Sequence, residues 1–232
     1  HQITVTADGY SGQTTSSFTV IPAGATKLQV LLPGEYNITG SSTSIGKGGV
    51  VAVSTAGIPI NLTVNLTDIY WNIHRTASQP TVKITTATGS GLCYYEAKPL
   101  TAQLVNGTTT FELTLKTATT IGWQIQAETI GAPSYTTNIS SVVKVNLNTI
   151  ASPRLQVLLP GQSPVPGDTA NLGRSTTAFS ATAGELFEVK LRRTDYYWNL
   201  VAEGGVPIEI KSDDPYGDPS DGTVAGYPSP QI

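Results

Sequence analysis

The feature that most constrains the fold of this chain is an internal repeat. The heptapeptide LQVLLPG at residues 28–34 occurs again at residues 155–161. The matches at this one offset are 28–34 with 155–161, Ala56-Gly57 with Ala183-Gly184, and DIYWN at 68–72 with DYYWN at 195–199. Three matches without a gap indicate a duplicated structural unit, so the fold must contain the same supersecondary frame twice.

Apolar and polar residues alternate with period two in the first copy. The apolar positions are Leu28, Val30 and Leu32; Ile60, Leu62, Val64 and Leu66; Phe111, Leu113 and Leu115; Ile121, Trp123 and Ile125; Val143, Val145 and Leu147. Such alternation marks strands with one buried and one solvated face, and turn-forming residues separate them. We therefore expect an all-β protein of tandem immunoglobulin-like sandwiches, since such a unit has about seven short strands.

The two ends of the sequence predict incomplete units. Residues 1–20 (HQITVTADGYSGQTTSSFTV) resemble residues 123–145, the last two strands of the first copy. We assign 1–21 to the terminal strands of a preceding or neighbouring unit, 25–150 to a complete sandwich, and 152–232 to a second sandwich without its last strands.

Incomplete sandwiches expose unpaired strand edges, so their lacking strands must come from elsewhere. Two explanations remain open. The missing strands belong to adjacent repeats of the same polypeptide, or residues 1–20 of one molecule complete the second unit of a neighbouring copy by β-augmentation. In the second case a head-to-tail homopolymer forms, which is a filament. The inserting side chains are then Ile3, Val5, Phe18 and Val20.

Composition and charge exclude several partners. The net charge is −3 with 12% charged residues, and no basic stripe exists for binding nucleic acid. No stretch near 20 apolar residues occurs, so we expect no membrane span.

Cys93 is the only cysteine, which excludes an intrachain disulfide. The chain holds no Met and no signal peptide, so we expect a mature or excised segment.

Three segments carry a family resemblance: LQVLLPGE, AGIPINLTVNLTDIYWNI and VNGTTTFELTLKTAT. They resemble bacterial immunoglobulin-like repeats of large secreted and surface-anchored proteins, which are distantly similar to invasin and intimin stalk domains. The resemblance covers essentially the whole chain and implies an extracellular or cell-surface setting. It implies a spacer, adhesin or filament component, and it carries no catalytic residues and no cofactor.

The resulting hypothesis is a structural subunit of an extracellular filament or surface stalk, and not an enzyme. An adhesin or a carbohydrate-binding module of a large secreted protein is the alternative, because this fold hosts many roles.

A copper enzyme is the third possibility. Lytic polysaccharide monooxygenases hold copper with an N-terminal His and a second His on a similar sandwich, and here these would be His1 and His74. Against this interpretation, His1 aligns with Trp123 and His74 aligns with Val201, so neither position is specialised. We therefore expect no metal site and no catalytic residues.

Other candidate sites each have a structural explanation. The N-x-S/T sequons are headed by Asn37, Asn61, Asn65, Asn106 and Asn138, and the phase of Asn61 and Asn65 predicts accessible side chains for glycan attachment. Tyr70, Trp71, Tyr196, Tyr197 and Trp198 form either a sugar-stacking platform or packing beneath a repeated turn, and their repetition favours packing. Asp213, Asp214, Asp218 and Asp221 suit calcium or a solvated linker. No thioester partner accompanies Cys93, and the phase of Lys116 and Lys144 opposes an isopeptide bond.

Overall fold

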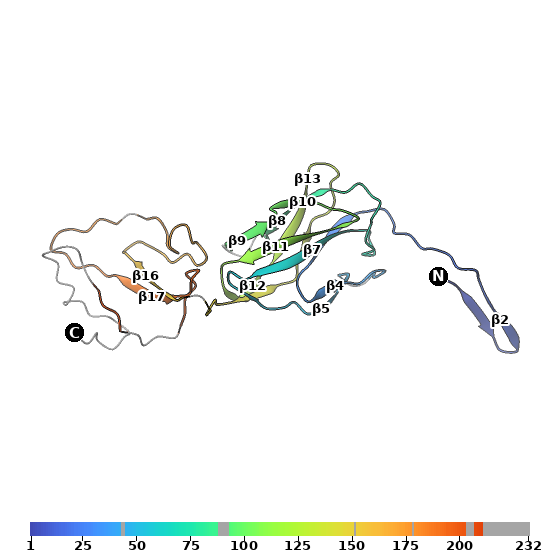
Figure 1. The fold of residues 1–232 in the computed structure, drawn as a ribbon, viewed down its shortest axis with the longest axis horizontal. Coiled ribbons are helices and arrows are strands. Elements are labelled where there is room, and N and C mark those ends of the chain that lie inside the picture. Colours follow the sequence, from blue (N-terminus) through green and yellow to red (C-terminus); the bar gives the residue numbers. More distant parts are fainter. Residues whose placement is uncertain (43–44, 88–92, 151, 178, 203–206, 211–232) are drawn as a thin grey trace.

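The computed structural model describes residues 1–42, 45–87, 93–150, 152–177, 179–202 and 207–210. Over these ranges the chain forms strands and no helix, which confirms the all-β expectation. Figure 1 shows three parts in a row: an N-terminal arm (residues 1–22), a central sandwich (23–148) and a second unit (152–210).

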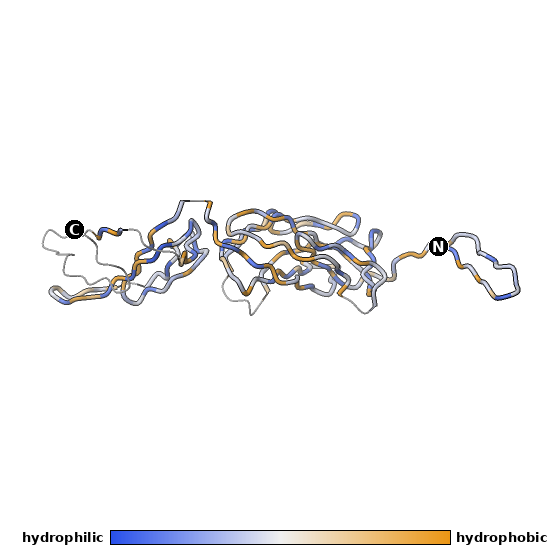
Figure 2. Tube along the Cα trace, turned by 90° about the horizontal axis from the view of Figure 1, so that it is seen from below, coloured by the Kyte–Doolittle hydropathy of each residue, from blue (hydrophilic) through white to orange (hydrophobic). Residues whose placement is uncertain are grey.

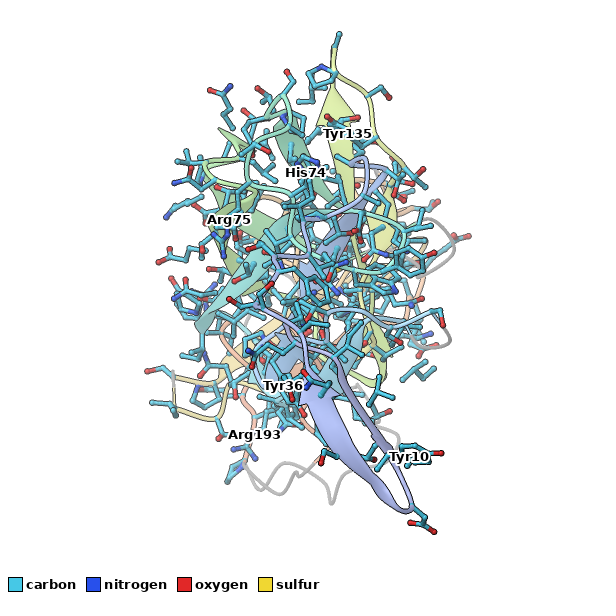
Figure 3. All side chains as sticks on the ribbon, turned by 90° about the vertical axis from the view of Figure 1, so that its right-hand side faces the viewer. Tyr10, Tyr36, His74, Arg75, Tyr135 and Arg193 are labelled. Atoms are coloured by element: carbon cyan, nitrogen blue, oxygen red, sulfur yellow. The ribbon has the colours of Figure 1, made fainter. Side chains whose placement is uncertain are left out.

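The arm carries β1 (Thr4–Ala7) and β2 (Tyr10–Thr14), which pair with each other as an antiparallel hairpin. All residues from 1 to 21 are exposed. Figure 3, viewed from the end of the arm, shows Tyr10 on this hairpin in front of the rest of the molecule.

The central sandwich holds thirteen of the strands. One sheet has the order β3-β7-β11-β9, a second has the order β10-β8-β13-β14, and a third, β12-β15-β6, includes one parallel pair. A small hairpin joins β4 to β5. The bounds are β3 (Lys27–Leu31), β4 (Glu35–Asn37), β5 (Lys47–Gly49), β6 (Ser54–Thr55), β7 (Pro59–Thr67), β8 (Thr81–Thr86), β9 (Tyr95–Lys98), β10 (Thr101–Gln103), β11 (Thr108–Leu115), β12 (Thr119–Trp123), β13 (Ile125–Ile130), β14 (Asn138–Ile139) and β15 (Val143–Asn146).

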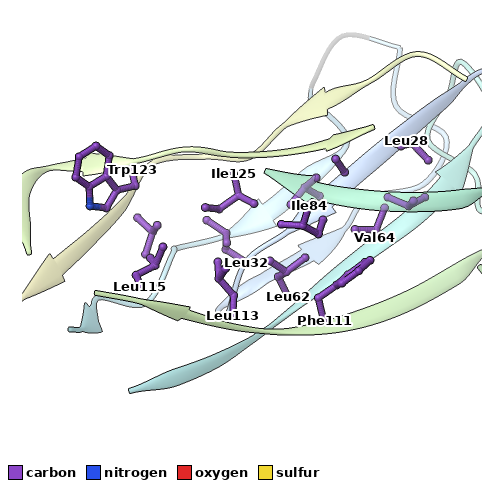
Figure 4. Close-up of a cluster of buried hydrophobic side chains, with 14 of the residues drawn as sticks. Leu28, Leu32, Leu62, Val64, Ile84, Phe111, Leu113, Leu115, Trp123 and Ile125 are labelled. Carbon is purple, nitrogen blue, oxygen red and sulfur yellow. The ribbon is translucent and has the colours of Figure 1, made fainter. Parts of the chain in front are cut away.

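The core of the central sandwich lies between the sheet β3-β7-β11-β9 and the other two sheets (Figure 4). Alternate apolar residues of β7 and β11 point into it, and β8, β13 and β15 supply the facing side. The largest of these side chains, Phe111, is fully buried. The period-two pattern predicted this core because each strand has one face against the facing layer.

The outer face of β3 is covered as well, which the sequence pattern did not predict. The side chain of Gln29 is fully buried, and its amide donates to the Gly46 carbonyl at 2.7 Å. Its carbonyl oxygen accepts from the amides of Asn37 and Asn65. The expectation that Asn65 is accessible is therefore wrong: the segment containing β4 and β5 covers this face, and the amide network satisfies the buried polar groups.

The predicted alternation also fails at residue 121. Ile121 is exposed rather than buried, while Trp123 and Ile125 face the core as expected. The pairing of β12 with β15 is irregular between Thr119 and Trp123, and Gly122 has a φ of 102°. A bulge of this kind turns the preceding side chain to the other face of the sheet.

In the second unit, β16 (Arg154–Leu158) pairs with β17 (Lys190–Thr194). These strands repeat β3 and the last part of β7: Arg154 lies opposite Thr194 as Lys27 lies opposite Thr67. The duplicated sequence therefore does form a duplicated strand pair.

Candidate assembly interface

The arm has the local structure of the closing strands of the central sandwich. In the arm, the Thr15 amide donates to the Ile3 carbonyl, and the Ile3 amide donates to the Thr15 hydroxyl. In the central sandwich, the Ser140 amide donates to the Ile125 carbonyl, and the Ile125 amide donates to the Ser140 hydroxyl. This reciprocal pair of hydrogen bonds makes Ile3 equivalent to Ile125.

Strand register extends the equivalence over the whole arm. In the arm hairpin Val5 lies opposite Gln13, and in the central sandwich Ala127 lies opposite Asn138. A tripeptide, Ala132-Pro133-Ser134, accounts for the shorter arm, because it separates Gly131 from Tyr135 whereas Gly9 and Tyr10 are adjacent. Residues 1–9 therefore correspond to 123–131, and residues 10–23 correspond to 135–148.

The connection to the following unit is the same at both places. The Ala23 amide donates to the Asp68 carboxylate at 2.9 Å, and the Asn148 amide donates to the Asp195 carboxylate at 3.0 Å. Asp68 and Asp195 are themselves equivalent in the repeat. The arm is thus joined to the central sandwich in the same way as the last strands of the central sandwich are joined to the second unit.

The ionised state of Asp68 suits this anchoring role. Burial by itself raises the pKa of this carboxyl group, but hydrogen bonds from Asn72, Ala23 and Tyr70 outweigh it and hold the pKa below its usual value. The carboxylate is therefore charged at neutral pH and accepts a strong hydrogen bond from Ala23, where the arm joins the central sandwich.

Exposure is what distinguishes the arm from its counterpart. Ile3, Val5, Phe18 and Val20 are 56%, 66%, 43% and 63% exposed. The equivalent residues Ile125, Ala127, Val143 and Val145 are at most 2% exposed. The four apolar side chains of the arm are therefore equivalent to core residues of the central sandwich, but they are exposed to solvent. Figure 2 shows hydrophobic positions along the arm and its connection to the central sandwich.

The second unit repeats the hydrogen bonding and tryptophan packing found around β3 of the central sandwich. The Gln156 amide donates to the Gly173 carbonyl at 2.7 Å, which repeats the bond from Gln29 to Gly46. Trp71 and Trp198 both have a φ of 65°. Each indole lies against the equivalent glycine, where an added Cβ would come within 2.1 Å of Trp71 and 2.2 Å of Trp198. Both tryptophans thus pack beneath the repeated turn, as the packing interpretation expects.

In the described part of the second unit, the core-facing side chains of β16 are about half exposed. Leu155 and Val157 on β16 are 50% and 41% exposed, whereas Leu28 and Val30 at the same positions of β3 are fully buried. The second unit also has a cavity of about 400 Å³ at the end of β16, whose lining includes Leu158, Phe179, Leu186 and Phe187.

In the central sandwich, β13 and β14 cover β3 at the equivalent place. The Leu28 amide donates to the Thr136 carbonyl, and the Val30 amide donates to the Asn138 side chain at 2.9 Å. The residues of the arm equivalent to Thr136 and Asn138 are Ser11 and Gln13. Over its described residues, the second unit has no counterpart of these contacts on β16.

The two histidines do not form a common site. The His1 ring lies against the Phe18 ring, with centroids 5.9 Å apart, on the exposed arm. His74 lies in the central sandwich, where its Nδ1 accepts from the Ala77 amide at 3.0 Å. Across the described ranges, no group of three or more His, Cys, Asp or Glu side chains is placed to hold a metal ion.

The sequons differ in accessibility. Asn61 and Asn106 are exposed and Asn65 is buried, while the half-buried Asn37 and Asn138 use their amides in hydrogen bonds to Gln29 and Val30. Only Asn61 and Asn106 thus present a freely accessible side chain. The candidate calcium ligands Asp213, Asp214, Asp218 and Asp221 lie outside the described residues.

Cys93 is the remaining candidate reactive group, and it is buried. Burial raises the pKa of its thiol to about 12, so the folded protein holds almost no thiolate at pH 8. We expect iodoacetamide to leave Cys93 unmodified at pH 8 until the central sandwich is unfolded in guanidinium. Mass spectrometry with and without denaturant measures this, and rapid labelling of the folded protein would contradict it.

Neither a family model, nor a curated protein, nor a solved structure matches this chain. Among the described residues, no helix is long and apolar enough to cross a membrane.

Proposed function

We propose that this chain is a structural subunit of an extracellular filament or stalk, in which immunoglobulin-like units join head to tail by strand complementation. The arm of one copy inserts against β16 of the second unit of its neighbour. The observation that carries the proposal is that the arm and β16 each expose apolar side chains whose repeat equivalents are buried against each other. Ile3 and Val5 of the arm are exposed, whereas the equivalent Ile125 and Ala127 of the central sandwich are buried. Leu155 and Val157 of β16 are likewise exposed, whereas the equivalent Leu28 and Val30 of β3 are buried.

The donor strands are already folded in the required shape. The hydrogen bonds within the arm repeat those of β13 and β14, so the arm does not have to find its own register on binding. A preorganised segment loses less conformational entropy when it binds, which favours association. In the proposed complex, Ser11 takes the position of Thr136 beside Arg154 of the neighbouring copy, and Gln13 takes the position of Asn138 near the Val157 amide.

The free energy available is sufficient only if most of the contacts form. Complete burial of a Val, Leu, Ile or Phe side chain contributes about 1.5–3 kcal/mol. Association itself costs about 4–15 kcal/mol, so six half-exposed side chains and the main-chain hydrogen bonds have to act together. Loss of one core contact should therefore weaken assembly strongly.

The inserted arm covers β16 but not every edge of the second unit. The neighbour of β7 on its other side is β11, and the described part of the second unit has no counterpart of that strand. The arm therefore supplies the closing layer over β16 and Val157, and β17 keeps one free edge.

Deleting residues 1–20 tests the proposal. All of these residues are exposed, so the central sandwich should keep its thermal unfolding temperature. The full chain should form regular fibres in electron micrographs and large species in light scattering, and the shortened chain should be monodisperse. Monomeric full-length chain, or fibres that survive the deletion, would overturn intermolecular strand donation.

A further inference from the structure

The contact between the central sandwich and the second unit is a defined junction. The Asn199 side chain donates to the Lys116 carbonyl at 3.0 Å and accepts from the Ala118 amide at 2.8 Å. The Tyr94 hydroxyl donates to the Asp168 carboxylate, and the Thr117 hydroxyl donates to the Pro166 carbonyl. Several directional hydrogen bonds across one contact fix the orientation of two units more firmly than a linker does.

Two glycines allow the close packing at this junction. Tyr197 of the second unit lies on Gly57 of the central sandwich, where an added Cβ would be 1.9 Å from the Tyr197 ring. Gly167 lies against Thr117 and Tyr94, with 2.3 Å from an added Cβ to the Thr117 hydroxyl. Tyr197 also packs against the core cluster of the central sandwich. The ring of Tyr197 thus reaches the unit that precedes it.

Part of these surfaces occurs a second time without a partner unit, although the described second unit holds no counterpart of Lys116, Thr117 or Ala118. Tyr70 is the repeat equivalent of Tyr197, and it is exposed at the end of the central sandwich that the arm leaves from. Gly40 is the equivalent of Gly167, and Gly184 is the equivalent of Gly57. An added Cβ at Gly40 or at Gly184 would meet nothing within 4 Å. Asn72 makes the bond to Asp68 that Asn199 makes to Asp195.

The backbone at these positions is preset for the contact. Gly57 and Gly184 have φ values of 78° and 80°. Ala23 is already bound to Asp68 as Asn148 is bound to Asp195, so the arm leaves the central sandwich with the anchoring of the occupied junction.

We infer that Tyr70 of one copy packs on Gly184 of the neighbouring copy and repeats the contact that Tyr197 makes with Gly57. The inference rests on the proposed head-to-tail assembly and names the surface that makes the assembly stiff. The arm supplies the attachment, and the contact of Tyr70 with Gly184 sets the angle between successive molecules. A filament with both junctions occupied is a rod, whereas one joined by the arm alone bends at every second unit.

The test uses Tyr70→Ala and Gly184→Ala in the full-length chain, with Tyr36→Ala as the control for loss of another exposed tyrosine. Gly184→Ala places a methyl group where the Tyr70 ring would lie. Both variants should still form fibres, because the arm and β16 are unchanged. Their persistence length in electron micrographs should fall at least about twofold, since a junction held only by a linker is flexible. Tyr70→Phe and Tyr36→Ala should match the wild type.

The outcomes separate the two proposals. Fibres of Tyr70→Ala and Gly184→Ala that are as stiff as the wild type would overturn the Tyr70 junction and leave strand donation intact. A wild-type chain that forms no fibres at any concentration would overturn both. A drop in stiffness with Tyr36→Ala equal to that with Tyr70→Ala would also contradict the inference, because Tyr36 has no place in the junction.

Discussion

Val157→Asp is expected to abolish fibre formation without unfolding the protein. Val157 is 41% exposed in the isolated chain, so the carboxylate stays hydrated and the cost to stability is about 1 kcal/mol or less. In the assembled state the same carboxylate would lie in the apolar layer beneath the arm, where an unpaired charge is strongly unfavourable. The critical concentration, measured by sedimentation of polymer, should rise at least about 100-fold, which corresponds to about 2.7 kcal/mol.

Its matched variant is Val30→Asp, at the equivalent position of the repeat. Val30 is fully buried beneath β13 and β14, so this change should destabilise the central sandwich by more than about 4 kcal/mol. Asn61→Asp changes the charge equally at an exposed position and should alter neither property. Normal polymerisation of Val157→Asp would show that the arm does not cover β16. A similar unfolding of both Val variants would show that the second unit is already closed.

The sequence predicted the strands and most of the core because the period-two pattern depends only on which face of a strand is buried. The sequence also locates the apolar residues of the arm, because residues 1–20 are similar in sequence to residues 123–145. The failures have two physical causes. The irregular pairing around Gly122 turns Ile121 to the exposed face. At Gln29 and Asn65 both faces of the sheet are covered, and burial of the polar face depends on the distant segment containing β4 and β5.

The junction could not be predicted from spacing alone. The contact of Tyr197 with Gly57 joins residues far apart in the chain, and only the structure shows which ring meets which glycine. The repeat nevertheless marks the glycine of this contact in the sequence. Gly57 and Gly184 are matched residues, and positive φ at both explains why glycine recurs there.

A covalent test can establish the register of the inserted arm. In the central sandwich Lys27 and Thr136 are bridge partners, and their equivalents across two molecules are Arg154 and Ser11. Neighbouring backbones in a sheet bring Cα atoms within the range of about 4.4–6.8 Å that a disulfide spans. Ser11→Cys with Arg154→Cys, in a Cys93→Ala background, should therefore give a ladder of dimers, trimers and longer species on non-reducing gels, and reductant should collapse it to one band.

Two control pairs make this experiment decisive. Lys27→Cys with Thr136→Cys should form a disulfide within one chain, which verifies the geometry on the folded central sandwich. Ser11→Cys with Lys190→Cys carries the same number of thiols, but Lys190 is exposed at the far end of β17, so it should give no ladder. Equal ladders from the Arg154 and Lys190 pairs would mean that the arm collides with the second unit without a fixed register. No ladder from the Arg154 pair, with the Lys27 pair oxidised, would exclude the arm from β16.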